Sequence, residues 1–368
     1  MKKLITICFL LIGCVSLSAM QQTTLDKHGK TNYQNHEERL KKVEDHLQLD
    51  NRYYDHLSSY NVNMYFVAEF LYWSGENEGF GIGYDLSESI DDNDQRIKVL
   101  KRDFDYGPAF RVGVGFKPCL DWNIYLSYTR FHHTSKEKYT GDLKPLGVAI
   151  NEQVYRIDSS FKIKYDILDL EFGRPFHVGQ TFTIRPHIGL RGGWIKQVGN
   201  NVGYEHLATP VPPEPTTPVY FDNSEKAWVL GTRAGFDIEL FFSENYGFSL
   251  YGALSGAIMY ANVDTLYQGR STNTAPLPVY YSFLMKENNK DELFVTLQSS
   301  LGLSWGDFLT ESEDVALCIR AGWEFNYWWD QYASLEQFAI QADRPLSFQE
   351  LNEGLLIQGL TVSARLDF

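Results

Sequence analysis

The sequence predicts an all-β protein, a transmembrane antiparallel β-barrel of about 10 strands, with 10–12 allowed. Apolar and polar residues alternate along many long segments, which is typical of strands with two different faces. The connections between these segments alternate between long and short, and the chain ends inside a strand on an aromatic residue. Beyond the N-terminus there is no run of about 18–20 apolar residues that could form a membrane-spanning helix.

Residues 1–19 have the features of a secretory signal peptide. Lys2 and Lys3 form a charged start, residues 4–12 are apolar, and residues 16–19 are mostly small. An alternative is that residues 11–14 form a lipoprotein cleavage box with Cys14 as the lipidated residue. Both interpretations predict export from the cytoplasm.

Residues 20–60 are predicted to form a periplasmic helical or coiled-coil segment that precedes the barrel. Within it, residues 33–57 have the pattern of an amphipathic helix. This helix either packs on its own barrel or joins copies of the chain into a homo-oligomer, for which a trimer is one possibility. Its apolar stripe consists of Leu40, Val43, Leu47, Tyr54 and Leu57.

Residues 61–368 are predicted to form the outer-membrane β-barrel. Most of the predicted strands exceed the roughly 9–11 residues that a tilted strand needs to cross a bilayer. The ten strands are expected at about 62–74, 104–117, 122–133, 155–174, 181–196, 226–242, 246–262, 292–306, 314–328 and 354–368.

The lengths of the connections predict how the barrel is oriented. Long connections are expected at 75–103, 134–154, 197–225, 263–291 and 329–353, and short ones at 118–121, 175–180, 243–245 and 307–313. Outer-membrane barrels have short periplasmic turns and long extracellular loops. We therefore expect extracellular long loops and, for an even strand number, two periplasmic termini. The 10–12 range allows for short hairpins within 75–103 and 263–291.

The C-terminal stretch GLTVSARLDF alternates up to its last residue. Leu360, Val362, Ala364, Leu366 and Phe368 share one face, which predicts contact with outer-membrane lipid. Such a strand must be paired on both sides, as in a closed barrel. Leu366 and Phe368 resemble the terminal signal by which outer-membrane barrels engage the barrel-assembly machinery. Tryptophan and tyrosine residues near other strand ends are typical of interfacial girdles.

Several stretches together resemble the Legionella major-outer-membrane-protein-like family, which has relatives in environmental chlamydiae. They are AEFLYW at 68–73, FRVGVGF at 110–116, DWNIYLSYTRFH at 121–132, LDLEFGRPF at 168–176 and IRPHIGLRGGWIKQ at 184–197. The resemblance implies an outer-membrane barrel with porin, ion-transport or surface-antigen roles. It supplies no catalytic residues.

Charged residues on the predicted inward faces are the candidate functional residues. They either line a selective channel or form a salt-bridged filling of a narrow barrel. The first interpretation predicts porin-like passive diffusion of small solutes, and the second a surface-exposed structural or adhesive protein with a plugged barrel. The candidates are Glu69, Arg111, Asp169, Glu171, Arg185, His187, Arg191, Arg233, Asp237, Glu239, Arg320 and Glu324.

Other functions are not predicted. A net charge of −14 without a basic stripe argues against nucleic-acid binding. The histidines show no metal-ligand spacing, and His187 lacks a nucleophile signature, so no enzyme activity, cofactor or metal is expected. In the strand at 155–174 the polar set changes phase near residues 166–168, which predicts a β-bulge.

Overall fold

The computed structural model describes residues 64–77, 81–86, 98–101, 104–118, 122–145, 154–179, 181–205, 218–242, 247–273, 279–310, 315–338 and 347–368. The signal peptide predicted at 1–19, the helical segment at 20–60 and the self-association assigned to 33–57 lie outside these residues. The chain divides into two compact units, Met1–Arg52 and Tyr53–Phe368, and every described residue belongs to the second. Among the described residues, no helix has the length and hydropathy needed to cross a membrane.

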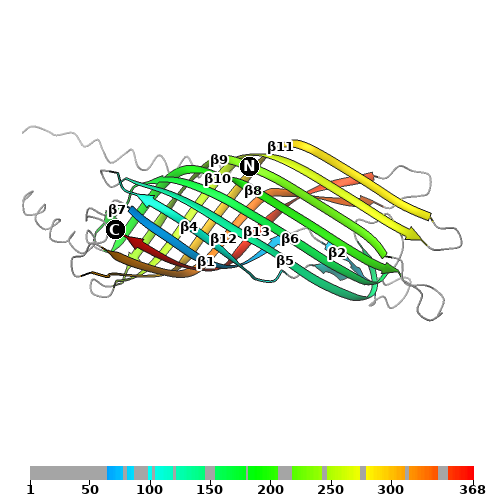
Figure 1. Cartoon of the computed structure of the whole chain (residues 1–368), viewed down its shortest axis with the longest axis horizontal. Helices are drawn as coiled ribbons and strands as arrows, with labels where there is room; N and C mark the ends of the chain where they lie inside the picture. Colours follow the sequence, from blue (N-terminus) through cyan, green and yellow to red (C-terminus); the bar gives the residue numbers. More distant parts are fainter. Residues whose placement is uncertain are drawn as a thin grey trace, which may run out of the picture. The chain divides into compact units, whose positions relative to one another are not determined.

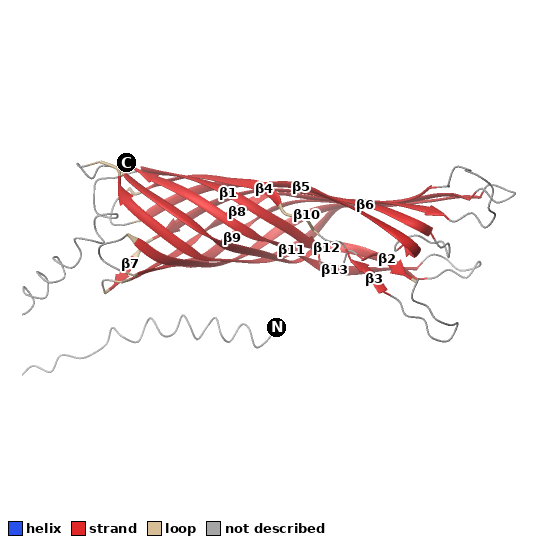
Figure 2. Cartoon of the chain, turned by 90° about the horizontal axis from the view of Figure 1, so that it is seen from below, coloured by secondary structure: helices blue, strands red, loops and turns tan. Residues whose placement is uncertain are grey.

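Ten strands close into an antiparallel barrel (Figures 1 and 2). β1 pairs with both β4 and β13, and the remaining neighbours around the ring follow chain order. This confirms the predicted fold, with the lower of the predicted strand numbers. The barrel strands are β1 (Met64–Asn77), β4 (Gly107–Phe116), β5 (Asn123–Pro145), β6 (Val154–Gly173), β8 (Phe182–Glu205), β9 (Pro218–Phe241), β10 (Phe248–Asn273), β11 (Val279–Phe308), β12 (Ala316–Phe338) and β13 (Ser347–Asp367).

Three short strands lie outside the ring and mark its two ends. β2 (Gly81–Asp85) and β3 (Lys98–Lys101) form a hairpin that pairs with the far part of β5. β7 (Phe176–Val178) pairs with the start of β8, at the opposite end of the barrel, which is also the end that holds the C-terminus (Figure 2). We call the end that carries β2 and β3 the long-loop end, and the end that carries β7 the short-turn end.

The predicted alternation of faces is present in the strands. On β4, Phe110 and Val112 are exposed on the outside of the barrel, whereas Arg111 points inward and is mostly buried. On β8, Ile188 and Leu190 are exposed and Arg191 is only 2% exposed. An outward apolar band with an inward polar face is what a lipid-embedded barrel requires.

The C-terminal strand is held on both sides, as its alternation predicts. Leu366 lies opposite Phe66 of β1 and opposite Leu317 of β12. The backbone N–H of Phe368 donates to the carbonyl oxygen of Met64 at 3.1 Å, and the Phe368 ring lies 5.7 Å from the Phe66 ring. The role of Leu366 and Phe368 in assembly stays a prediction.

The strands extend well beyond their predicted ends at the long-loop end. β5 continues to Pro145, β8 to Glu205 and β10 to Asn273. Much of the chain predicted as loop at 134–154, 197–225, 263–291 and 329–353 is therefore paired strand. The segment 75–103 contains the β2–β3 hairpin, and 263–291 contains the paired extensions of β10 and β11.

The β-bulge predicted near residues 166–168 is wrong. The pairing of β6 with β8 runs without a register shift from Arg156 to Gly173. What changes is the polarity of both faces at once. Toward the short-turn end, Leu168 and Phe172 point outward and Asp169 and Glu171 inward. Toward the long-loop end, Lys162 and Lys164 point outward, and the inward residues Phe161, Ile163, Tyr165 and Ile167 are apolar and buried.

This polarity inversion has a physical cause. Within lipid, a barrel turns its apolar side chains outward; in water it must turn them inward. The inversion falls beside Trp194 of β8 and Trp228 of β9, which lie opposite each other as an interfacial pair would. The ten-stranded ring therefore consists of a lipid-facing part and a continuation whose interior resembles the core of a soluble protein.

Candidate functional site

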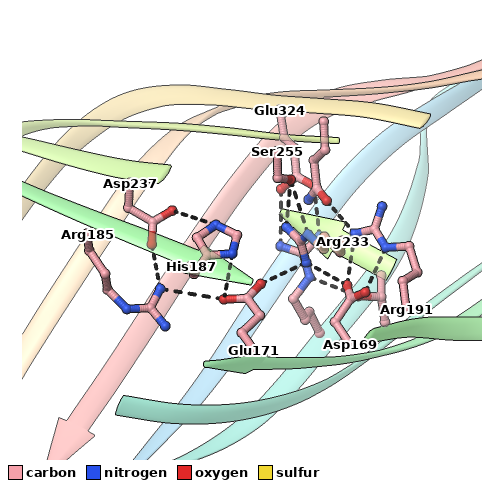
Figure 3. A network of polar contacts seen from close by, with 12 residues as sticks. Asp169, Glu171, Arg185, His187, Arg191, Arg233, Asp237, Ser255 and Glu324 are labelled. Carbon is pink, nitrogen blue, oxygen red and sulfur yellow. Dashed lines mark hydrogen bonds and ion pairs between the residues drawn. The ribbon is translucent and has the colours of Figure 1, made fainter. Parts of the chain in front are cut away.

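All twelve predicted inward residues do lie on the inside of the barrel. They are carried by β1, β4, β6, β8, β9 and β12, because alternate residues of each strand point into the lumen. We call this set the charged layer; most of it forms a single network of ion pairs (Figure 3). Whether these residues line a channel stays a prediction.

Arg111 connects one side of the lumen with the other. Its guanidinium binds the carboxylate of Glu69 on the adjacent strand β1 at 2.7 Å. It also binds Glu324 at 2.8 Å, although β12, which carries Glu324, is not a neighbour of β4. The Nε–H of Arg111 donates to the hydroxyl of Thr129 at 2.8 Å. A direct ion pair between strands that are not adjacent means that side chains bridge the lumen at this level.

Arg191 is the most buried charge of the network. Its guanidinium binds Asp169 through two atoms, at 2.7 and 2.9 Å, and donates to the side-chain oxygen of Gln298 at 2.5 Å. Gln298 in turn donates to Glu324 at 2.7 Å, which joins this group to Arg111. Because β8 and β11 are not adjacent, the Arg191–Gln298 contact is a second bridge across the lumen.

The network continues toward the short-turn end. Arg233 binds Asp169 at 3.0 Å and Glu171 at 2.8 Å. Arg185 binds Asp237 at 2.6 Å and approaches Glu171 at 3.5 Å (Figure 3). Arg185 and Arg233 are thus each placed between two carboxylates, and Arg233 of β9 reaches across β8 to those of β6.

His187 lies between the two carboxylates at this end. Its Nδ1 lies 3.9 Å from the carboxylate of Glu171 and its Nε2 lies 3.9 Å from that of Asp237, both beyond hydrogen-bonding distance. Among the described residues, no hydrogen bond joins His187 to a hydroxyl or a thiol. Arg320 and Glu239 form a separate pair at 3.2 Å between β12 and β9, a third contact across the lumen.

The energetics of the charged layer depend on this pairing. Desolvating an ion costs several kcal/mol, and only close partners of opposite charge repay that cost. The layer holds five arginines against six carboxylates, so its charges nearly cancel. Its exposure rises toward the short-turn end, from 2% for the Arg191 side chain to 36% for that of Asp237. The barrel interior is therefore open to solvent at the short-turn end and closed at the level of Arg191.

An apolar layer fills the lumen on the long-loop side of the charged layer. Every strand of the ring contributes to it, and Phe131, Phe294 and Trp328 are fully buried. Tyr165 of β6 packs edge-on against Trp328 of β12 and accepts a hydrogen bond from Asn326, so this layer too is bridged between distant strands. Its members are Leu71, Trp73, Ala109, Phe131, Phe161, Ile163, Tyr165, Ile167, Ile195, Ala227, Val229, Ala257, Met259, Ala261, Val263, Phe294, Trp328, Leu355 and Ile357.

A polar contact across the lumen lies beyond the apolar layer. The side-chain amide of Gln197 on β8 donates to that of Gln331 on β12 at 2.7 Å, and both are 1% exposed. Asn77 of β1 donates to Gln197 at 3.3 Å. Three successive levels of the interior are thus spanned by direct side-chain contacts.

Sequence reasoning missed two parts of this site. Gln298 lies on the inward face of β11, where the alternation with Val295 and Leu297 would have identified it. The apolar layer does not follow from the sequence, because inward apolar residues on β6 have the same pattern as a change in the phase of the strand's alternation.

Within the described part of the chain, no group of three or more His, Cys, Asp or Glu side chains is arranged to hold a metal ion.

A closed antiparallel barrel with an outward apolar band and a buried, paired set of charges defines an integral β-barrel protein of the bacterial outer membrane. Within that class, the chain belongs to the family described as the Legionella pneumophila major outer membrane protein precursor, whose family model matches residues 59–367. This confirms the family that the sequence motifs indicate and gives an outer-membrane location.

Comparison with solved structures gives matches of low identity. The outer membrane protease OmpT from Escherichia coli is 9% identical, with a TM-score of 0.35, over 83% of this chain and 96% of that chain. The translocator domain of the autotransporter NalP from Neisseria meningitidis is 10% identical, with a TM-score of 0.30, over 90% and 98%. The P. putida toluene transporter TodX is 8% identical, with a TM-score of 0.29, over 86% and 91%. No curated protein sequence matches this chain. No function is inferred from these similarities.

Proposed function

We propose that this chain is a structural outer-membrane protein with a filled barrel, which holds its long-loop end at the cell surface. This is the second of the two functions that the sequence leaves open. The observation that carries it is the apolar layer, whose nineteen buried residues come from all ten strands of the ring. No open diffusion path for hydrophilic solutes passes through such a layer unless it rearranges.

The same proposal includes an orientation. The short-turn end, which carries the start of β1 and the C-terminus, faces the periplasm, and the extended strands with the β2–β3 hairpin project outside the cell. The polarity inversion supports this, because only the long-loop side continues as a barrel suited to water. The extended part also has a second apolar cluster, formed by Ile82, Leu100, Leu143, Val154 and Ile157, which packs the hairpin onto β5 and β6. A rigid extracellular platform of this kind suits a surface antigen or an adhesive protein.

No catalytic step forms part of the proposal. His187 with Asp237 and Glu171 is the arrangement nearest to a hydrolytic set, and among the described residues no hydroxyl or thiol is hydrogen-bonded to His187. The side chain of His187 is 1% exposed, so a substrate has no access to it.

A gated channel is the second candidate function. The observation that favours it is the solvent-open vestibule at the short-turn end, where Arg320 and Asp237 are about one-third exposed. In this alternative the apolar layer is a hydrophobic gate that opens on a signal.

Solute flux into liposomes distinguishes the two functions. Refolded wild-type protein is expected to give no swelling with arabinose, while a general porin reconstituted in parallel does. The variant Phe131→Ala/Phe294→Ala/Trp328→Ala removes bulk from the apolar layer only. A filled barrel stays closed in this variant, because Arg111 and Arg191 still bridge the lumen below. Flux through the wild type would contradict the proposal, and flux appearing only in the variant would favour the gated channel.

A further inference from the structure

A row of lysines crosses the outside of the barrel at the level of the polarity inversion. Lys196 of β8 lies directly opposite Lys164 of β6 on one side and Lys226 of β9 on the other. Lys162 follows on the same outward face of β6, because residues two apart along a strand share a face. Lys226 and Lys162 are exposed, and Lys164 and Lys196 are partly exposed. We call Lys164, Lys196 and Lys226 the lysine row.

The lysine row has no ion-pair partner in the part of the chain that the structure describes. Among the described residues, none of its amines forms an ion pair, and the other lysines of this surface are the charges that act on Lys196. The acidic residues beside the row have partners of their own. Asp166 accepts from Tyr128 and lies within 2.7 Å of a ring nitrogen of His132, and Asp264, opposite Lys226, accepts a hydrogen bond from the backbone of Asn289.

Like charges placed directly opposite one another on a sheet destabilise it. Inside the barrel, by contrast, positive and negative side chains are paired almost one to one. An unmatched row of three amines on adjacent strands therefore indicates an anion that comes from outside the protein.

The position of the row identifies where that anion lies. Trp194 comes two residues before Lys196 and Trp228 two residues after Lys226, so both tryptophans lie on the lipid side of the row and on the same outward face. These tryptophans mark the interface, so the amines lie at the level of lipid headgroups. Adjacent strands are about 4.8 Å apart, so the row spans roughly 10 Å across the three strands. That span suits a headgroup with more than one phosphate better than a single-phosphate glycerolipid.

We propose that the lysine row is a binding site for the phosphorylated sugar headgroup of a lipopolysaccharide. The assignment rests on the proposed orientation, which places the row in the outer leaflet. Ammonium groups bind phosphate oxygens by charge-assisted hydrogen bonds, and one anionic headgroup would relieve the mutual repulsion of all three lysines. The tryptophans beside the row would contact the sugar and acyl part of the same molecule.

The test measures binding of purified lipid A to the refolded full-length protein in a mild detergent by native mass spectrometry. Diphosphorylated lipid A, dephosphorylated lipid A and phosphatidylglycerol are compared. The variant is Lys164→Gln/Lys196→Gln/Lys226→Gln. The matched control, Lys98→Gln/Lys138→Gln/Lys286→Gln, removes three exposed lysines of the long-loop end outside the row. Both leaflet levels are accessible in detergent, so the result does not depend on orientation or on whether the lumen is filled.

The wild type and the control are expected to bind diphosphorylated lipid A equally, and more tightly than the other two lipids. Each basic residue near an anionic lipid surface contributes on the order of a fivefold gain in binding, so the row variant should bind about 100-fold more weakly. Equal binding by the row variant would overturn the site. Equal binding of phosphatidylglycerol and lipid A by the wild type would overturn the assignment to lipopolysaccharide.

Discussion

Replacing Arg191 with methionine tests whether the charged layer is desolvated. Methionine keeps most of the length of the side chain and removes its charge. Asp169 would then lose the two bonds of 2.7 and 2.9 Å that hold it and would keep only Arg233 at 3.0 Å. Removing one partner of a buried pair costs about 3–5 kcal/mol. Because Asp169 keeps one arginine, we expect a loss near the lower value, about 3 kcal/mol.

The matched double variant Arg191→Met/Asp169→Leu is expected to recover most of that loss. It removes both charges, and Arg233 keeps its pair with Glu171 at 2.8 Å. Replacing a buried pair by apolar residues is often close to neutral, so the double variant should lie within about 1 kcal/mol of the wild type. A coupling of this size between two residues in contact is within the measured range.

The assay is urea unfolding of the refolded barrel in lipid vesicles, followed by tryptophan fluorescence. Arg130→Met is the control, because Arg130 is 48% exposed on the outside and lies 4.0 Å from Asp166. Exposed pairs contribute about 0–1 kcal/mol. If Arg191→Met cost no more than Arg130→Met, the lumen at Arg191 would be hydrated, and the argument for a filled barrel would fail.

Three further outcomes are expected. Phe131→Ala, which removes a fully buried ring of the apolar layer, should lower the free energy of unfolding by about 3–5 kcal/mol, whereas Phe131→Leu should cost less than about 1.5 kcal/mol; equal small effects in urea unfolding would contradict the packing. Gly115→Ala should cost about 1–3 kcal/mol, because its added carbon would lie 1.8 Å from the Tyr65 ring, and Tyr65→Ala should suppress that cost in the double variant. In a Cys119→Ser/Cys318→Ser background, cysteines at Leu190 and Phe236 should react with lipid-phase reagents, and cysteines at Arg185 and Asp237 should not; the reverse labelling would contradict the assignment of faces.

Much of the fold follows from the sequence because lipid imposes a strict rule. Outward residues such as Phe110 and Leu190 must be apolar, so alternation and connection lengths suffice to place ten strands. The rule no longer holds where the strands leave the lipid. On the long-loop side of Leu168 the inward and outward faces of β6 exchange polarity. The sequence of β6 therefore has the same pattern as a strand with a register shift. For this reason the strand extensions and the apolar layer were not predicted.

The candidate site was only partly within reach of sequence reasoning. Inward position follows from parity, so all twelve charged residues were identified. Their partners across the lumen were not, because a contact such as Arg111 with Glu324 or Arg191 with Gln298 depends on the diameter of the barrel and on side-chain length. Those contacts, together with the apolar layer, support the proposal of a filled barrel.

Single-channel recording in planar bilayers tests the filled barrel most directly. Refolded wild-type protein, with insertion verified by its resistance to urea extraction, is predicted to give no stable conductance steps in 1 M KCl. Reproducible unitary steps from the wild type would show that ions pass the level of Arg191 and Trp328, and would contradict the account.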